Sequence, residues 1–381
     1  MKSTSIMAQI PSPFGSQNTY DPYFTTSPLT RLSFFRTSNK LLHKASVHPS
    51  AKYLCMRDLN PLRKDGQLQY VNYDQVRSII GEPYSSEEKD QVQAFSSNNK
   101  QPTLVFLGLD LESKAAELSL ENYKGTPYFA LDVSEQTQET ISALTTSTSA
   151  AFTPTRVDLS LSYAESSIYS QARSFIDWNN RNTFCSACGS RTLSVQAGSK
   201  VICPPTDAGA SRPPCPTRTG LHNTAFPRTD PTLIAAPVSH DAKRVLLGRG
   251  KRWPQNYWSC LSGFVEPGES MESATRREVF EESGVRVADV RIHSSQAWPY
   301  PSTLLVGTIA RCEREADERL SYPEQELEEA RWFELGEVER ALDHGHAMWE
   351  EPPKGYTGIR LPGDKLMAHR TLRGVLRLFH R

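Results

Sequence analysis

The sequence lacks three features that would each indicate where the protein works. Its 381 residues contain no run of about 18 apolar residues, so no membrane-spanning helix is expected. Residues 1–17 carry one Lys and no continuous apolar core, which does not fit a secretory signal. Acidic and basic residues balance at 43 each, so no global field attracts nucleic acid or membranes, although a local basic patch is compatible with this balance. We therefore expect an intracellular protein without a membrane partner.

Cysteine is also scarce, and its number is odd. Seven cysteines that include a C-x-x-C pair favour reduced thiols and a metal site over a disulfide framework. Four thiolates suit a closed, structural Zn²⁺ site. The candidate ligands are Cys185, Cys188, Cys203 and Cys215. The last two do not repeat the C-x-x-C spacing, so the third and fourth ligands stay open, with His222 as an alternative.

A redox-active C-x-x-C is the competing interpretation of this motif. Such a pair belongs at the start of a helix in a βαβ unit. Gly189 and several polar residues follow Cys188 instead. We therefore prefer structural zinc.

Length and composition predict several domains. A chain of 381 residues exceeds the usual length of one domain. Ser, Thr, Pro and Asn dominate the first segment, short alternating apolar runs mark the second, and a Ser/Thr/Ala-rich stretch follows. The predicted order is a disordered arm (1–28), a β-rich N-terminal domain (29–142), a linker (143–159), a helix with a zinc ribbon (160–231) and a C-terminal domain (232–381).

The stretch with the most chemistry is residues 263–285, GFVEPGESMESATRREVFEESGV. It predicts a Gly-rich turn, a helix over residues 271–283 and a stop at Gly284. On that helix three glutamates at positions i, i+3 and i+4 share one face: Glu278, Glu281 and Glu282. Like charges repel there, whereas Mg²⁺ or Mn²⁺ would take their oxygens as ligands and bridge to a substrate phosphate.

A plain solvated acidic face is the alternative for an arbitrary Glu-rich helix. The spacing argues against it here. Seven Gly, Glu and Arg residues stand at fixed intervals, which average residue usage would produce with a chance on the order of 10⁻⁸ to 10⁻⁹ per starting position.

These residues match a known pattern. The stretch resembles the Nudix box, G-x5-E-x7-R-E-U-x-E-E-x-G-U, at every position, with Val279 and Val285 as the two apolar residues U. Taken together with the C-x-x-C-G motif, FPRTDP (226–231) and SQAWPYPST (295–303), it resembles the NADH pyrophosphatase (NAD diphosphatase) branch of the Nudix hydrolases, in particular fungal members.

The last motif departs from the branch marker S-Q-P-W-P-F-P-x-S at three positions. This chain has Ala297, Tyr300 and Thr303 there. Tyr keeps a stacking ring and Thr keeps a hydroxyl, while Ala297 loses one rigid φ restraint. None of these changes removes a group that the chemistry needs.

The resemblance implies an α/β fold, an α/β/α sandwich with a mixed sheet, preceded by a zinc ribbon and a Nudix-associated N-terminal domain. It implies metal-dependent hydrolysis of NADH and NAD⁺ to nicotinamide mononucleotide and AMP, and removal of NAD caps from RNA. The implied cofactors are catalytic Mg²⁺ or Mn²⁺ and structural Zn²⁺. A homodimer and a cytoplasmic or peroxisomal location are also implied, although residues 378–381 do not match the S-K-L address.

The resemblance also assigns site residues. The catalytic metal would be held by Glu278, Glu281, Glu282 and Glu326, with Glu282 the candidate for activating water. Arg277 would act in catalysis by pairing with Glu269 to brace the box loop. The positions that would contact the dinucleotide are Phe264, Gln296, Trp298, Tyr300 and Ala368.

Two other functions stay open. One is a Nudix hydrolase of ADP-ribose or another nucleoside diphosphate compound. The other is a non-catalytic zinc-ribbon binding protein with a vestigial box, which the intact carboxylates disfavour. Four basic residues near the zinc motif could support RNA: Arg191, Lys200, Arg212 and Arg218.

Overall fold

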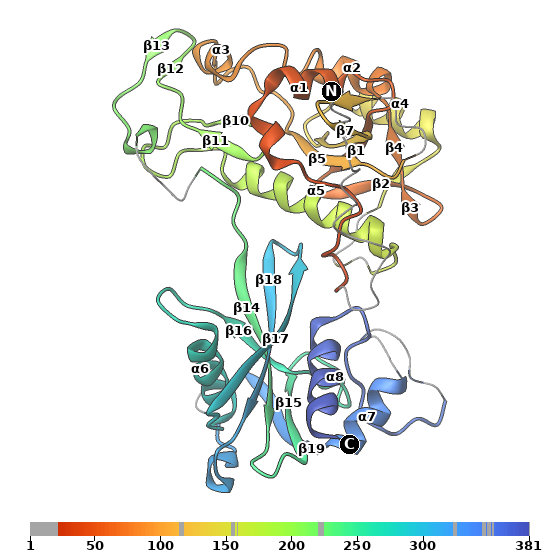
Figure 1. Ribbon diagram of the computed structural model, residues 1–381, viewed down its shortest axis with the longest axis vertical. Helices are drawn as coiled ribbons and strands as arrows, with labels where there is room; N and C mark the ends of the chain where they lie inside the picture. The colour runs from red at the N-terminus through yellow and green to blue at the C-terminus, as the bar shows by residue number, and fades with distance from the viewer. Residues whose placement is uncertain are drawn as a thin grey trace, which may run out of the picture. The chain divides into compact units, whose positions relative to one another are not determined.

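The computed structural model describes residues 22–113, 118–153, 157, 159–219, 225–322, 326–344, 348, 352 and 354–380. The chain divides into two compact units, each described by itself (Figure 1). The first comprises Met1–Arg228 with Pro299–Ser302, and the second comprises Thr229–Trp298 with Thr303–Arg381. In the described part of the chain, no helix is long and apolar enough to span a membrane.

A mixed sheet forms the centre of the first unit. Its strands are β1 (Lys52–Arg57), β2 (Asn60–Lys64), β3 (Gln67–Leu68), β4 (Tyr70–Val71), β5 (Leu104–Asp110), β8 (Thr126–Asp132) and β9 (Ala151–Phe152). The order is β3-β2-β1-β8-β5, with β4 beside β1 and β9 beside β2. Only the β1–β8 pair in this sheet is parallel among the described residues. A separate hairpin joins β6 (Ser119–Leu120) to β7 (Tyr123–Lys124).

Helices cover both faces of this sheet. The helices of this unit are η1 (Ser33–Thr37), α1 (Asn39–Ser46), α2 (Tyr73–Ile80), α3 (Glu88–Gln93), α4 (Gln138–Thr148) and α5 (Tyr163–Arg181). Tyr53 and Cys55 of β1 share a core with residues of α1, α2 and α4. The alternate residues Leu54 and Met56 are equally buried, and α5 packs on β5 and β8. The N-terminal domain is therefore rich in strands, as predicted, but its helices make it α/β.

Three predicted boundaries differ from the structure. Part of the expected linker is α4, whose Ile141 and Leu144 are buried in the core of the first unit. Part of the expected disordered arm is also packed, because Tyr23 and Phe24 are 1% and 2% exposed and the Tyr23 hydroxyl donates to the Leu161 carbonyl. Residues 1–21 lie outside the described part. The helix expected from residue 160 begins at Tyr163, because Ser162 and Glu165 form a capping box.

The zinc-ribbon segment follows α5 as two short hairpins. The first pairs β10 (Leu193–Val195) with β11 (Lys200–Ile202), and the second pairs β12 (Thr206–Asp207) with β13 (Ala210–Ser211). The 3-10 helix η2 (Pro216–Arg218) comes next.

The second unit contains the stretch that resembles the Nudix box. Its sheet consists of β14 (Asp230–Val238), β15 (Arg244–Gly250), β16 (Leu261–Phe264), β17 (Asp289–Trp298), β18 (Thr303–Arg311) and β19 (Leu327–Glu334). The order is β17-β18-β14-β15-β19, with β16 beside β14. The β14–β18 pair is parallel and the other described pairs are antiparallel, which confirms a mixed sheet.

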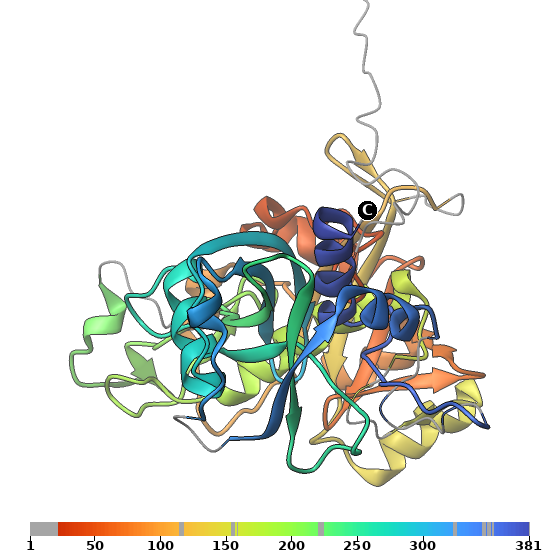
Figure 2. The same ribbon diagram turned by 90° about the horizontal axis from the view of Figure 1, so that it is seen from below.

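The helices of this unit form one layer on each face of the sheet (Figure 1, Figure 2). They are α6 (Met271–Ser283), η3 (Glu315–Glu318), α7 (Leu335–His344) and α8 (Met367–Phe379). Ala235 of β14 shares a core with Val279 of α6. The next residue, Ala236, shares a second core with Leu335 of α7 and Leu372 of α8. This alternation confirms the predicted α/β/α sandwich.

Candidate functional site

Helix α6 spans Met271–Ser283, as predicted, because both of its ends are capped. The Ser270 side chain accepts a hydrogen bond from the Ser273 amide at 3.2 Å. Gly284 ends the helix with φ 74°, and its amide donates to the Phe280 carbonyl at 2.7 Å. A Cβ at Gly284 would also overlap Ser321 Oγ, so a side chain is excluded there.

Gly263 brings strand β16 against the acidic side of this helix. A Cβ at this position would overlap the carboxylate of Glu278. Only a residue without a side chain lets the strand and the carboxylate approach this closely. The first glycine of the box therefore positions Glu278, a role that the sequence pattern alone does not show.

Arg277 braces the box loop, and its predicted pairing with Glu269 is present. Its guanidinium donates to both Glu269 carboxylate oxygens, at 2.7 and 2.8 Å, and to the Phe264 carbonyl at 2.9 Å. Nη1 also donates to Glu278 and Glu281, at 2.8 Å each. These bonds lower the pKa of Glu269 to about 2, chiefly through the hydrogen bond from Arg277, and raise the pKa of Arg277. One cation thus engages three carboxylates.

The four carboxylates predicted to hold the catalytic metal have different surroundings. Glu278 and Glu281 meet at Arg277 Nη1. Glu282 is 5% exposed on the same helix, and Glu326 is exposed just before β19. In the described part of the chain these four do not form a group whose donor atoms all lie within 4.8 Å of one another. Like-charged carboxylates repel, and here Arg277 supplies the positive charge for two of them.

Two of the predicted dinucleotide contacts lie in one row across the sheet. Phe264 pairs with Thr232, Thr232 with Leu305, and Leu305 with Gln296. Three strand spacings of about 4.8 Å separate Phe264 from Gln296 by roughly 14 Å. Residues in register share a face, and this face carries α7 and α8, since Ala236 of the same β14 face packs there.

The environments of these side chains differ. Phe264 is 61% exposed, whereas Gln296 is 1% exposed and its Nε2 donates to the Lys365 carbonyl at 2.8 Å. Ala368 is buried in α8. Trp298 is partly buried and lies on the same face of β17 as Gln296, two residues away.

Tyr300 belongs to the first unit, unlike the other predicted contacts. Its ring lies 5.9 Å from that of Phe24, and the Arg173 guanidinium lies 4.8 Å from its centre. Arg173 also donates to the Pro299 carbonyl at 2.8 Å. These contacts pack the Tyr300 ring against Phe24 and Arg173 of the first unit.

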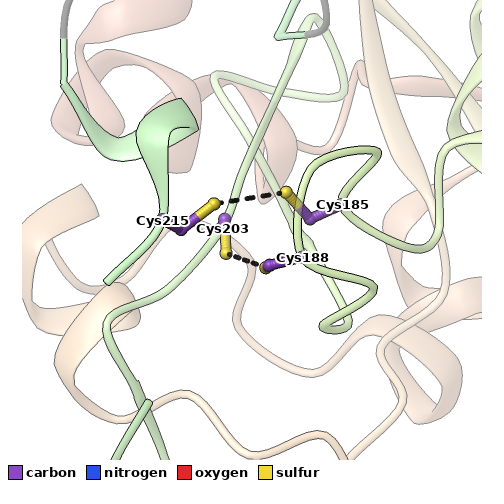
Figure 3. Close-up of side chains that lie close together, drawn as sticks. All are labelled: Cys185, Cys188, Cys203 and Cys215. Atoms are coloured by element: carbon purple, nitrogen blue, oxygen red, sulfur yellow. Dashed lines mark hydrogen bonds between the residues drawn. The ribbon is translucent and has the colours of Figure 1, made fainter. Parts of the chain in front are cut away.

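The four predicted zinc ligands converge in the first unit (Figure 3). Their sulfur atoms all lie within 4.8 Å of one another, with 3.6 Å between the sulfurs of Cys185 and Cys215 and between those of Cys188 and Cys203. These separations are too long for disulfides. Cys215 thus joins the cluster as predicted, and the alternative ligand His222 lies outside the described residues.

The donor chemistry of this cluster fits zinc. Hydrogen bonds from Ser190 lower the pKa of Cys188 to about 6, whereas burial raises the pKa of Cys203 to about 12. Four thiolates at this spacing repel one another unless a soft divalent cation neutralises them, and Zn²⁺ prefers such a set. Thr217 and Arg218 also contact the cysteine sulfurs. Sequence reasoning missed Thr217 and named Arg218 only as a candidate for RNA, although both directly follow Cys215-Pro216.

Three family models match the chain in succession. Residues 50–178 match the NADH pyrophosphatase-like rudimentary NUDIX domain, residues 180–208 the NADH pyrophosphatase zinc ribbon domain, and residues 230–352 the NUDIX domain. The "NAD-capped RNA hydrolase" of Schizosaccharomyces pombe is 33% identical over 84% of this chain and 85% of the relative. The chain belongs to the Nudix family.

Two further Nudix relatives also match most of the chain. The "NAD-capped RNA hydrolase NPY1" of Saccharomyces cerevisiae is 30% identical, and the match covers 93% of this chain and 94% of that protein. The "NAD-capped RNA hydrolase NUDT12" of Homo sapiens is 30% identical, and the match covers 93% of this chain and 73% of that protein. The similarity therefore includes the N-terminal domain and the zinc ribbon as well as the Nudix domain.

Proposed function

We propose that this Nudix protein hydrolyses the diphosphate bond of NADH and NAD⁺ to nicotinamide mononucleotide and AMP, and removes NAD caps from RNA. The observation that carries the proposal is the arrangement at α6, where Arg277 gathers the carboxylates of Glu269, Glu278 and Glu281 beside Gly263. Relatives named as NAD-capped RNA hydrolases match this chain over most of their length, which supports the choice of substrate.

The reaction requires water to attack a phosphorus atom that negative oxygens surround. When bound, Mg²⁺ or Mn²⁺ neutralises those oxygens and lowers the pKa of a water molecule. Glu278, Glu281, Glu282 and Glu326 offer the hard oxygen donors that such a cation prefers. We propose that Glu282, a buried carboxylate of α6, accepts the proton from the attacking water.

Arg277 and Glu269 act through the other residues in this proposal. Their bidentate ion pair fixes the turn before α6, and the Arg277 bond to the Phe264 carbonyl fixes the end of β16. Glu278 and Glu281 are thereby held in place before substrate arrives. This preorganisation makes Arg277 a positioning residue.

The dinucleotide would lie along the row that joins Phe264 to Gln296. Phe264 is exposed enough to stack on a ring, and Gln296 and Trp298 lie on the same face. Ala368 is small and belongs to α8, the helix that covers this face, so it would leave room for the nucleotide. Tyr300 stays in the proposed contact set on the family resemblance alone.

Product analysis tests this function directly. Purified protein with Mg²⁺ or Mn²⁺ is incubated separately with NADH, NAD⁺, ADP-ribose and NAD-capped RNA, and the products are separated by chromatography. We expect mononucleotide and AMP from NADH and NAD⁺, and 5′-monophosphate RNA from the capped substrate. Turnover of ADP-ribose alone would contradict the proposal and favour the alternative, a Nudix hydrolase of ADP-ribose. No turnover of any substrate would favour a non-catalytic binding protein.

Finer features of the proposal rest on the family resemblance. We propose Mg²⁺ or Mn²⁺ as the catalytic cation, Zn²⁺ at the four cysteines, a homodimer, and a cytoplasmic or peroxisomal location. Activity with each cation after chelation, metal analysis, light scattering and imaging of a tagged chain test these points in turn. Monomeric mass at micromolar concentration would remove the homodimer.

A further inference from the structure

A hollow beside the Nudix box is not used by the proposed reaction. Its volume is about 430 Å³, and three arginines and two apolar side chains line it: Arg276, Arg277, Phe280, Arg286 and Val287. Ligand pockets typically measure about 300 to 1,000 Å³. The hollow is therefore large enough to hold part of a ligand.

Two of the three arginines keep their charge available. Arg277 is engaged by carboxylates. Arg276 and Arg286 are exposed, and neither forms an ion pair with a carboxylate of the described residues. Arg276 Nη2 donates to the Ala288 carbonyl at 3.0 Å, and the Arg286 guanidinium lies 5.5 Å from the centre of the Phe280 ring. Their remaining N–H groups can donate to an anion.

Two nearby acids, Asp317 and Glu272, interact by charge with Arg286 and Arg276 and offset only part of this positive charge. Asp317, whose carbonyl accepts from the Arg286 amide, pairs its own carboxylate with Arg314 at 2.9 Å. Glu272 lies one turn before Arg276 on α6, but no ion pair joins the two within 4.0 Å in the described chain. The hollow is thus a local basic patch on a chain with no net charge.

Except for Arg277, the residues of this patch are not required by the box pattern. Arg276 and Phe280 occupy positions that the pattern leaves open, and Arg286 follows its last residue. Phe280 is 39% exposed next to these arginines. Guanidinium groups that contact phosphates, together with an exposed aromatic ring on which a base stacks, are what single-stranded nucleic acid needs for binding.

We propose that this hollow binds the phosphodiester backbone of the RNA chain that follows an NAD cap. The inference rests on the proposed function, since it assigns one of the proposed substrates a second contact area. Arg277 lies between the hollow and the proposed catalytic carboxylates, because it lines the hollow and also bonds to Glu278 and Glu281. RNA attached to the diphosphate would therefore have a basic surface next to the cleavage site.

The test compares substrates with and without an RNA chain. KM and kcat are measured for NADH and for an NAD-capped RNA of about ten nucleotides, in wild type and in the double variant Arg276→Gln/Arg286→Gln. The matched control is Arg291→Gln/Arg340→Gln, which removes the same charge from exposed positions on β17 and α7. The single variant Arg286→Gln keeps the Arg276 hydrogen bond to the Ala288 carbonyl. It therefore shows the effect of removing one positive charge without the loss of that bond.

We expect KM for the capped RNA to rise roughly five- to tenfold in the double variant, as for the loss of two exposed ion pairs. KM for NADH and both kcat values should stay at the wild-type level. The slope of log KM against log salt for capped RNA should fall by about 1.4, because each lost phosphate contact on a single strand contributes about 0.7. Arg286→Gln should give a smaller change of the same kind.

Three results would overturn the inference. They are an unchanged KM for capped RNA, an equal loss with NADH, and an equal loss in the control pair. Wild-type protein that cleaves NADH but not capped RNA would also overturn it while leaving NADH hydrolysis intact. Failure of the proposed function is distinguishable, since it appears in wild-type protein as no turnover of NADH or NAD⁺.

Discussion

Replacing Arg277 by Ala removes the cation at the centre of the Nudix box. The side chain makes five hydrogen bonds, two to Glu269 and one each to Glu278, Glu281 and the Phe264 carbonyl. The Glu269 side chain is 16% exposed, so the variant leaves a carboxylate that is partly shielded from water without its partner. We expect lower stability and lower turnover together, because the same bonds hold the loop and the catalytic carboxylates.

The pKa of Glu269 sets the size of the effect on stability. A shift from 4.5 to about 2 corresponds to about 3 kcal/mol as an upper bound. The box lies at the surface, where solvent screening weakens ion pairs, so we discount this value to about 2 kcal/mol at pH 7. A loss of this size is a large part of the stability of a typical domain.

The sign of the pH dependence follows from the direction of that shift. Because the pKa of Glu269 is lower in the folded protein, its stabilising contribution is complete above the unfolded value of 4.5 and is lost as pH falls through about 2. About half remains near pH 3. The difference in unfolding free energy between wild type and Arg277→Ala should therefore shrink between pH 5 and pH 3.

Urea unfolding at pH 7, 5, 4 and 3, followed by circular dichroism, measures this difference. The control Arg291→Ala removes an arginine that pairs with Asp289 at the surface, where the two side chains are 68% and 61% exposed. It should change the free energy of unfolding by less than about 0.5 kcal/mol at every pH. An Arg277→Ala protein with wild-type stability at pH 7, or with a loss that does not depend on pH, would refute the reasoning. Full turnover would refute the positioning role.

Three other variants test separate parts of the structure. Glu282→Gln should fold normally and lose about 100-fold or more in kcat, because water activation and metal binding are both impaired; kcat near wild type would assign the role elsewhere. Gly263→Ala should lower kcat and cost about 1–3 kcal/mol, since its Cβ would overlap the Glu278 carboxylate, and an unaffected protein would contradict that contact. Cys215→Ser should lose bound zinc and lower the melting temperature of the first unit, whereas full zinc content by metal analysis would exclude Cys215 as a ligand.

Local signals in the sequence predicted α6 and the cysteine cluster. Ser270 and Gly284 define the ends of α6, and its carboxylate stripe follows from helical periodicity. The C-x-x-C motif required a nearby second pair, which Cys203 and Cys215 provide. Composition was a poorer guide, since the Ser/Thr-rich residues 144–148 form the end of α4 around the buried Leu144.

Contacts between distant segments could not be predicted from spacing. The row from Phe264 to Gln296 depends on the register of β16, β14, β18 and β17, which are far apart in the sequence. The family resemblance predicted the Arg277–Glu269 pair but not the two further carboxylates that Arg277 contacts, because one cation can be shared only when the helix and the loop have folded together.

The end of β16 joins the two halves of the proposed site. Gly263 faces α6 and contacts the Glu278 carboxylate, while the next residue, Phe264, projects to the opposite face of the sheet in the row that contains Gln296. Arg277 bonds to the Phe264 carbonyl and to the carboxylates. A movement of this strand end would therefore displace the diphosphate chemistry and the nucleotide contact together, which explains why one arginine and one glycine of the box position residues on both sides of the sheet.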